Sequence, residues 1–207
     1  MNVSHEKKLI FVHIPKCGGT TIKTFLKTRL EGHGHRWASE IQRAHPCLWS
    51  EYTTLCCVRN PWDMEVSMFF NRLGVPGFGG PEDHTLTAVR GFAQSLRLGQ
   101  RWPLPPSGVS QWVGERNPSE KSLMNYITDR KGKIIVNEII RQENLEVELE
   151  TFYKKYCPTL AAPAPLRSYN RIPHLPYQDY YSEQWMIDCV AERNQDYIEH
   201  FGYEFDS

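Results

Sequence analysis

The sequence predicts an α/β domain in which helices flank a mostly parallel central sheet. The chain has 207 residues, and at about 150 residues per domain we expect one domain over residues 1–207. Hydrophobic residues make up 40% of the chain and charged residues 23%, which is typical of globular proteins and excludes extensive disorder. Short apolar segments alternate with segments of helical periodicity, an order typical of parallel sheets with helical crossovers.

The first two predicted strands each lead into a predicted helix. Residues 9–14 (LIFVHI) are rich in β-branched and aromatic side chains and stop at a proline, so they indicate a buried strand. A helix over about residues 21–30 follows, with Thr20 as its N-cap and apolar side chains on one face. Residues 53–58 (TTLCCV) form the second buried strand. A proline then suits the first turn of a helix over residues 61–73.

The rest of the chain predicts one more strand and four more helices. The third strand is expected at residues 134–140, after a turn. Segments rich in glycine and proline, such as residues 74–83, are expected to be loops. The remaining helices have apolar faces at helical spacing and are expected at residues 37–43, 85–98, 145–156 and 182–201.

Charge and cysteine content narrow the class of protein. Basic and acidic residues number 24 each, and a net charge of zero excludes a broadly basic nucleic-acid binder. No run of about 18 apolar residues occurs, so we expect no membrane partner. The N-terminus lacks the features of a secretory signal, and the six cysteines include no CxxC pair. A cytoplasmic protein with reduced thiols and no metal site is therefore expected.

The most informative segment is FVHIPKCGGTT, residues 11–21, where the first strand meets the first helix. Its two glycines let backbone N–H groups approach a ligand, its two threonines offer hydroxyl donors, and the helix N-terminus attracts negative charge. This arrangement predicts a cradle for a phosphate or another tetrahedral anion; a tight turn without a ligand is the alternative. The residues expected to line the cradle are Lys16, Cys17, Gly18, Gly19, Thr20 and Thr21.

This loop differs from the common P-loop in the order of its residues. In the common motif the lysine follows the glycines and a magnesium-binding hydroxyl comes next. Here Lys16 precedes both glycines, and no later strand ends in an obvious acidic metal ligand. The loop is therefore not the common P-loop, and the fold expected around it is a P-loop-like, three-layer domain.

A second segment, CCVRNPWDMEVSMFF at residues 56–70, offers another anion site. Arg59 follows the second strand, and Ser67 lies about two turns into the next helix. An arginine fork with a nearby hydroxyl suits a phosphate. The alternative is that Arg59 pairs with Asp63 and Ser67 only fills space. Since ligands bind at the carboxyl ends of parallel strands, both segments should lie at one rim of the sheet.

Together, the two segments resemble the nucleotide-binding signatures of sulfotransferases that use 3′-phosphoadenosine 5′-phosphosulfate (PAPS). The chain is most similar to the carbohydrate-type branch, which includes heparan sulfate 2-O-sulfotransferases and many short bacterial members. In that family a PKxGGT-type loop binds the 5′-phosphosulfate, and an R-N-P-x-D-x-x-x-S segment binds the 3′-phosphate. IIRQENL at residues 139–145 also resembles the family, so the likeness covers about the whole chain. Cys17 departs from the threonine or other small residue that is usual there.

The resemblance implies an enzyme that moves a sulfuryl group from PAPS, its co-substrate, to a hydroxyl acceptor without a metal ion. The acceptor would be a carbohydrate or a small polyhydroxylated metabolite. Lys16 would contact the bridging oxygen and stabilise charge on the leaving group, as electrostatic catalysis requires. The loop residues would hold the 5′ side of the nucleotide, and Arg59 and Ser67 would hold the 3′-phosphate.

The acceptor hydroxyl also needs a general base, and histidine suits this role near neutral pH. The His-Gly-His element at residues 33–35 resembles one in the 2-O-sulfotransferase branch, where histidine is the base. His35 is the expected base and His33 the alternative, with Glu40 and His45 as further candidates. His13, within the first strand, is expected to be a satisfied core histidine.

Two loop residues extend the expected site, and two other functions stay open. Trp102 is a candidate for stacking on a sugar, and Arg171 for a further contact with the 3′-phosphate. A small P-loop-like kinase or nucleotide hydrolase would instead bind ATP with magnesium. A non-catalytic nucleotide-binding module would bind the donor and transfer nothing.

Overall fold

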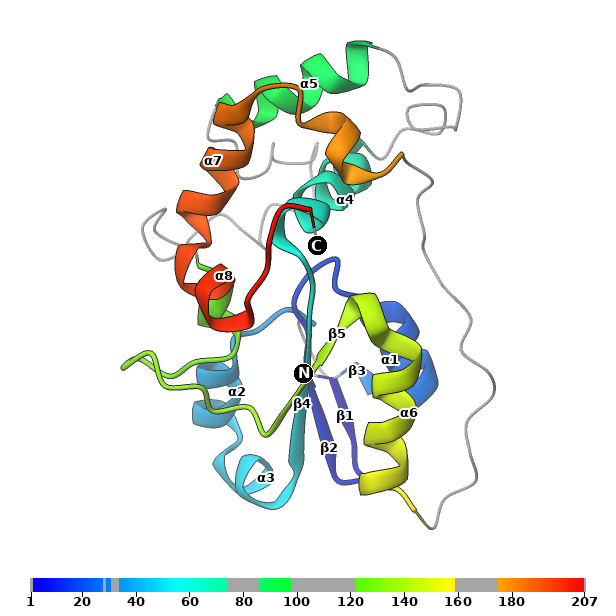
Figure 1. The fold of residues 1–207 in the computed structure, drawn as a ribbon. Helices are drawn as coiled ribbons and strands as arrows, with labels where there is room; N and C mark the ends of the chain where they lie inside the picture. The colour runs from blue at the N-terminus through cyan, green and yellow to red at the C-terminus, as the bar shows by residue number, and fades with distance from the viewer. Residues whose placement is uncertain are drawn as a thin grey trace. The chain divides into compact units, whose positions relative to one another are not determined.

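A computed structural model describes the chain over residues 2–27, 29–30, 34–73, 86–97, 122–158 and 175–206 (Figure 1). The chain divides into two compact units. The first combines Met1–Arg59 with Leu123–Asn170, and the second combines Asn60–Ser122 with Arg171–Ser207. Within the described parts of both units, no helix has the length and apolar character needed to cross a membrane.

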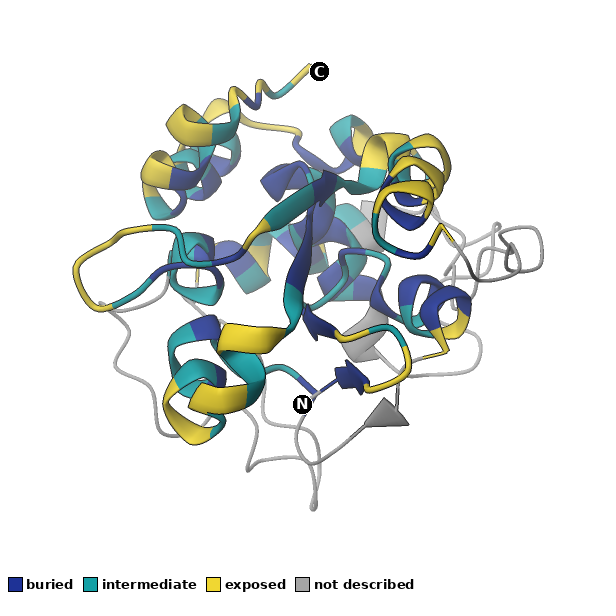
Figure 2. Cartoon of the chain, turned by 90° about the horizontal axis from the view of Figure 1, so that it is seen from below, coloured by how far each residue is buried: buried dark blue, intermediate teal, exposed yellow. Residues whose placement is uncertain are grey.

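The first unit is built on a mostly parallel sheet, which confirms the α/β class. Among the described residues the strand order is β3-β1-β2-β4-β5, where β2, β4 and β5 run parallel and β1 runs antiparallel to both of its neighbours. The strands are β1 (Asn2–Ser4), β2 (Leu9–Val12), β3 (Arg29–Leu30), β4 (Thr53–Val58) and β5 (Glu138–Arg141). β2 is buried along its whole length, and β4 is buried at every residue but its first (Figure 2). Buried parallel strands are typically continuous apolar runs, as β2 is along its whole length and β4 is from Leu55 onward.

Helices cover both faces of this sheet (Figure 1). α1 and α6 lie side by side on one face, where the rings of Phe25 and Tyr153 meet edge to face at 5.6 Å. α2 and α3 lie on the other face. Their bounds are α1 (Gly19–Leu26), α2 (Ala38–Ala44), α3 (Pro46–Glu51) and α6 (Leu145–Tyr156).

The beginning of the chain differs from the prediction in four respects. The strand expected over residues 9–14 ends at Val12, because the chain then leaves the sheet to form the loop before α1. α1 begins at Gly19 with Gly18 as its N-cap, so Thr20 lies inside the helix. The helix ends at Leu26 because Lys27 adopts a left-handed φ of 50°. Residues 29–30, expected in the helix, pair with β1 as β3.

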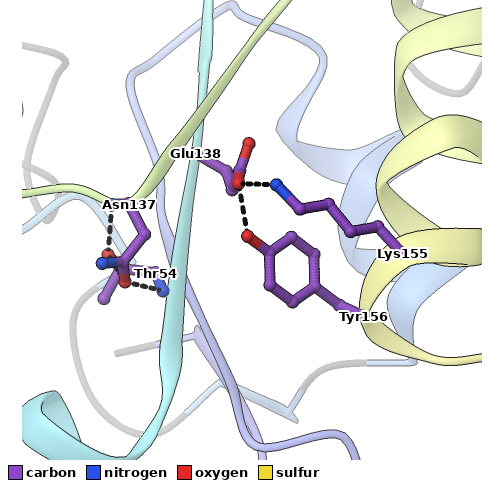
Figure 3. A network of polar contacts seen from close by, with 5 residues as sticks. All are labelled: Thr54, Asn137, Glu138, Lys155 and Tyr156. Atoms are coloured by element: carbon purple, nitrogen blue, oxygen red, sulfur yellow. Dashed lines mark hydrogen bonds and ion pairs between the residues drawn. The ribbon is translucent and has the colours of Figure 1, made fainter.

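The third parallel strand is shorter than expected and is fastened by side chains (Figure 3). Ile134 forms an isolated bridge with Thr128, and β5 begins only at Glu138. Asn137, just before β5, accepts hydrogen bonds from the backbone N–H and the hydroxyl of Thr54, both at 2.8 Å. These contacts take the place of backbone pairing where the two strands begin to meet, and so help to fix the register of β5 against β4.

Figure 3 also shows how β5 is tied to the helix that covers it. The carboxylate of Glu138 accepts a hydrogen bond from the Lys155 ammonium at 2.6 Å and another from the Tyr156 hydroxyl. Both partners lie in the last turn of α6. The contact with Lys155 is a partly exposed ion pair, so its effect is to align α6 more than to stabilise the fold.

The second unit packs helices around aromatic side chains. Its helices are α4 (Pro61–Leu73), α5 (Leu86–Arg97), α7 (Gln184–Arg193) and α8 (Gln195–Phe201). The rings of Phe92 and Tyr181 meet edge to face at 5.1 Å, as do those of Phe70 and Tyr180 at 5.2 Å. The single helix expected over residues 182–201 is two helices, because Asn194 leaves the helical conformation and becomes the N-cap of α8.

Candidate active site at the loop between β2 and α1

The loop that joins β2 to α1 is held in an unusual backbone conformation. Lys16 and Gly18 have φ angles of 63° and 70°, in the left-handed region that favours glycine. The side chain of Cys17 is fully buried, and its Sγ lies 3.5 Å from the carbonyl oxygen of Pro15. Its backbone N–H donates to the carbonyl oxygen of Ile14 at 3.4 Å. Cys17 therefore anchors the loop to the protein core, which its buried thiol faces.

Gly19, the first residue of α1, lies directly against the ring of His13. A Cβ atom at this position would overlap the imidazole. From the sequence, a glycine is expected here because it lets a ligand approach the backbone. The packing of His13 is a second, independent reason for glycine at this position. Glycine at residue 19 thus lets a bulky ring sit beneath the first turn of the helix.

Replacing Gly19 with alanine is expected to destabilise the fold by about 3 kcal/mol, because the imidazole cannot move out of a packed core without cost. Gly132→Ala is the matched control: Gly132 has a φ of 79° with open space around it, so only backbone strain of about 1 kcal/mol is expected. Chemical denaturation measures both values. If Gly19→Ala is no more costly than the control, His13 does not pack against residue 19 as described.

Two cations converge on the loop. The guanidinium of Arg59, which follows β4, donates from Nη1 to the carbonyl oxygen of Lys16 at 2.8 Å. Both side chains are half-buried. Burial lowers the pKa of Lys16, and the charge of Arg59 lowers it further, while nearby Cys17 acts in the opposite direction. Positive charges held together and partly away from water favour a ligand with multiple negative charges.

The convergence of these cations follows from the parallel pairing of β2 and β4. Val12 is in register with Cys56, so both strands end at the same rim of the sheet. The two motifs therefore meet there through Lys16 and Arg59, as the sequence predicts. Ser67 lies in α4, in the second unit, and is half-buried.

His35 lies beside the loop with a defined tautomer. Its ring lies against that of His13 with 4.1 Å between centroids and a tilt of 39°, and its Nδ1 lies 3.2 Å from the carbonyl oxygen of His13. Because a carbonyl only accepts hydrogen bonds, Nδ1 carries the proton in the neutral ring and Nε2 holds the lone pair. Burial lowers the pKa of His35, with Lys23 adding to this effect and the hydrogen bond opposing it. His35 is therefore a neutral imidazole near pH 7, which is the form a general base needs.

The other candidate residues have different surroundings. Thr20 is half-buried and Thr21 is buried in the first turn of α1. Glu40 accepts a hydrogen bond from the N–H of Trp37 at 2.9 Å and so supports the start of α2. His45 is half-buried between α2 and α3. Three candidates lie outside the described residues: His33, Trp102 and Arg171.

Sequence reasoning missed two asparagines that organise these segments. The side chain of Asn2 donates to the carbonyl oxygens of Phe11 and Gly34, at 3.3 and 3.1 Å, and so holds the segment that carries His35. Asn60 caps α4 in the second unit, where its Oδ1 accepts from the N–H of Trp62 at 3.0 Å. Asparagine before proline is a helix-start signal that could have identified the second role. Asn2 had no such signal.

His13 is buried, as expected of a core histidine, but it is not satisfied. The residue is 7% exposed, and its Nδ1 has no hydrogen-bond partner among the residues that the structure describes. Burial lowers the pKa of His13 to about 2, with His35, Lys23 and Lys16 adding to the effect. The imidazole is therefore neutral at any pH at which the protein works.

The low pKa of His13 predicts that acid destabilises the fold. In the unfolded chain the ring takes up a proton near its ordinary pKa of 6.5, and in the folded chain it does so only near 2. Stability is therefore complete above pH 6.5 and declines as the pH falls, by about 2 kcal/mol between about pH 7 and 5 from this residue alone. Denaturation at both pH values should show a smaller decline for His13→Leu. An equal decline in the variant would contradict the buried, neutral ring.

The described residues supply cationic anchors, a glycine-containing loop at a helix N-terminus and a neutral imidazole, which suits transfer of an anionic group to a hydroxyl. No group of three or more His, Cys, Asp or Glu side chains among them is placed to hold a metal ion. Comparisons with models of protein families, with curated proteins and with solved structures give no match.

Proposed function

We propose that this chain is a PAPS-dependent sulfotransferase that acts on a hydroxyl of a carbohydrate or a small polyhydroxylated metabolite. The observation that carries the proposal is the meeting of Lys16, Arg59 and His35 around one loop. The Arg59 guanidinium donates a 2.8 Å hydrogen bond to the backbone carbonyl oxygen of Lys16 in that loop. A hydrogen bond to the backbone of His13 holds His35 beside the loop. A nucleotide with a 5′-phosphosulfate and a 3′-phosphate fits the pair of cations, and a hydroxyl acceptor fits the imidazole.

In this mechanism PAPS supplies an activated sulfuryl group, whose bond to the phosphate oxygen breaks as the acceptor oxygen bonds to sulfur. Lys16 neutralises the charge that develops on the departing oxygen. The Nε2 lone pair of His35 takes the proton of the acceptor hydroxyl. Each residue thus acts where charge changes most during the transfer, which is where electrostatic and general-base catalysis have most effect.

The rest of the donor site is proposed from the sequence resemblance. Gly18, Gly19, Thr20 and Thr21 belong to the segment that would hold the 5′ side, with Cys17 supporting it from the core. Arg59 and Ser67 would hold the 3′-phosphate. Because Arg59 also bonds the carbonyl oxygen of Lys16, it would link the two phosphate positions. Six free cysteines support a reducing compartment, and we place the enzyme in the cytoplasm.

An acceptor screen with sulfur-labelled PAPS tests the proposal. The purified chain is incubated with neutral oligosaccharides, acidic oligosaccharides and small polyols, and labelled products are separated by charge. We expect label on one acceptor class with the wild-type chain and none with Lys16→Ala. A chain that binds the donor but leaves it intact with every acceptor would instead be a nucleotide-binding module.

A further inference from the structure

Core packing alone does not explain why residue 13, which is buried, is a histidine and not an apolar residue. The residue is 7% exposed, and within the described parts of the chain its Nδ1 has no hydrogen-bond partner, an arrangement that a leucine of similar volume would avoid. Buried polar atoms without partners are rare in proteins and are often found at functional sites. The site it adjoins is the loop between β2 and α1.

The ring of His13 is enclosed by three neighbours. It stacks on Phe11 with 5.4 Å between centroids and an angle of 26°, and it lies against His35 with 4.1 Å between centroids and a tilt of 39°. On a further side it fills the space that a Cβ on Gly19 would need. The ring of His13 therefore contacts β2, the first residue of α1 and the proposed base, His35.

We propose that His13 is the positioning residue of the base, since its ring and its backbone carbonyl together hold the His35 imidazole with the proton on Nδ1 and the lone pair on Nε2. This inference rests on the proposed function, which gives His35 its role. His13 itself does not touch the acceptor, and it acts through His35.

The geometry excludes a proton relay between the two rings. A relay needs an N–H of one ring to point at a nitrogen of the other in the ring plane. These rings instead lie face against face, tilted by 39° with 4.1 Å between centroids, and the Nδ1 of His35 bonds to the backbone of His13. The side chain of His13 thus supplies a surface and the backbone supplies the hydrogen bond.

Burial is the main cause of the lowered pKa of both imidazoles, and neighbouring cations add to it. The charged groups that face His13 are Lys16 from the loop and Lys23 from α1, and Lys23 also faces His35. Removing the His13 ring admits water to His35 and leaves Lys23 in place. The pKa of His35 should then rise towards its ordinary value. The backbone carbonyl of residue 13 remains, but without the ring beside it the His35 imidazole can turn away from that carbonyl and populate its second tautomer as well.

Nitrogen-edited NMR of the histidine side chains tests this inference independently of any activity. In the wild-type chain, neutral His35 should be protonated at Nδ1. In His13→Ala its titration midpoint should move up by about half a pH unit or more, with both tautomers present. Phe152→Leu is the matched control, because it alters another buried ring of the first unit that contacts neither histidine, and it should leave His35 unchanged.

Kinetics then separate positioning from a merely structural role. His13→Ala should lower kcat by about 10- to 100-fold, move the acid limb of its pH profile upward and leave the affinity for 3′-phosphoadenosine 5′-phosphate unchanged. His13→Leu keeps the volume of the side chain and should have a smaller effect in the same direction. If the alanine variant fails to fold, the leucine variant replaces it in these measurements.

Two results would overturn the inference. One is a wild-type His35 protonated at Nε2 when neutral, which needs no variant to observe. The other is a titration and tautomer of His35 that are the same in the His13 variants as in the wild type. If no acceptor is ever sulfated, the proposed function fails, while the NMR result still decides whether His13 positions His35.

Discussion

Lys16→Ala is expected to lower kcat by about 10³-fold while the chain remains folded, because removal of one group that stabilises transition-state charge has an effect of this size. The side chain is half-buried beside Arg59, and the repulsion between the two cations means that its loss does not weaken the fold. Steady-state kinetics and chemical denaturation measure the two quantities separately.

Lys8→Ala is the matched control for this experiment. Lys8 has a φ of 48°, close to the 63° of Lys16, so both variants place alanine in a left-handed conformation. Lys8 is exposed and precedes β2, whereas Lys16 follows it, so the two lie at opposite ends of the strand. The control should keep its activity. Wild-type turnover in Lys16→Ala would remove Lys16 from the mechanism.

His35→Asn is expected to lower kcat by about 10²- to 10⁴-fold, the range that general-base catalysis contributes. The asparagine amide can still donate to the carbonyl oxygen of His13, as Nδ1 does now, but it has no basic nitrogen. Binding of 3′-phosphoadenosine 5′-phosphate should stay unchanged, because the residue acts on the acceptor.

The pH profile gives a second measurement of the same residue. Since the pKa of His35 is lowered, the base stays unprotonated below the ordinary histidine value, and the acid limb of kcat/KM should lie below pH 6.5. His35→Asn should lose this limb. If the variant keeps both the activity and the limb, another group takes the proton, and His33 is the first to examine.

Local patterns in the sequence predicted the elements whose signals are strong. The strand over Thr53–Val58 and the helices Pro61–Leu73 and Leu145–Tyr156 have the predicted bounds. Each combines a clear apolar pattern with a recognisable end, such as the proline that begins α4. The α/β class followed from their alternation.

Two of the missed elements, β1 and β3, depend on contacts between distant segments, whereas the missed helix α3 is a short local one. β1 has only three residues, too few for any periodicity, and it is a strand because β2 and β3 pair with it. The same pairing draws Arg29–Leu30 out of the helix that their spacing suggested. The break at Asn194 is a local effect, but the apolar face continues across it and conceals it.

The sequence predicted which residues belong to the candidate site, but it did not predict the contacts that join the histidines within it. The loop, Lys16 and Arg59 could be chosen from their residue types, and parallel pairing brings them together. The role of His13 could not be predicted, because a histidine within an apolar strand is expected to be a core residue. Its contact with His35 arises because Asn2 holds Gly34, and such a contact has no pattern in sequence.

Calorimetry with two nucleotides tests the central claim most directly, which is that the loop binds a PAPS-type nucleotide without a metal. 3′-Phosphoadenosine 5′-phosphate and ATP are each titrated into the chain, with magnesium and with a chelator. We predict that 3′-phosphoadenosine 5′-phosphate binds at least about tenfold more tightly, with the same affinity under both conditions. ATP binding that is equal or tighter, and that requires magnesium, would contradict the account and indicate a kinase or nucleotide hydrolase.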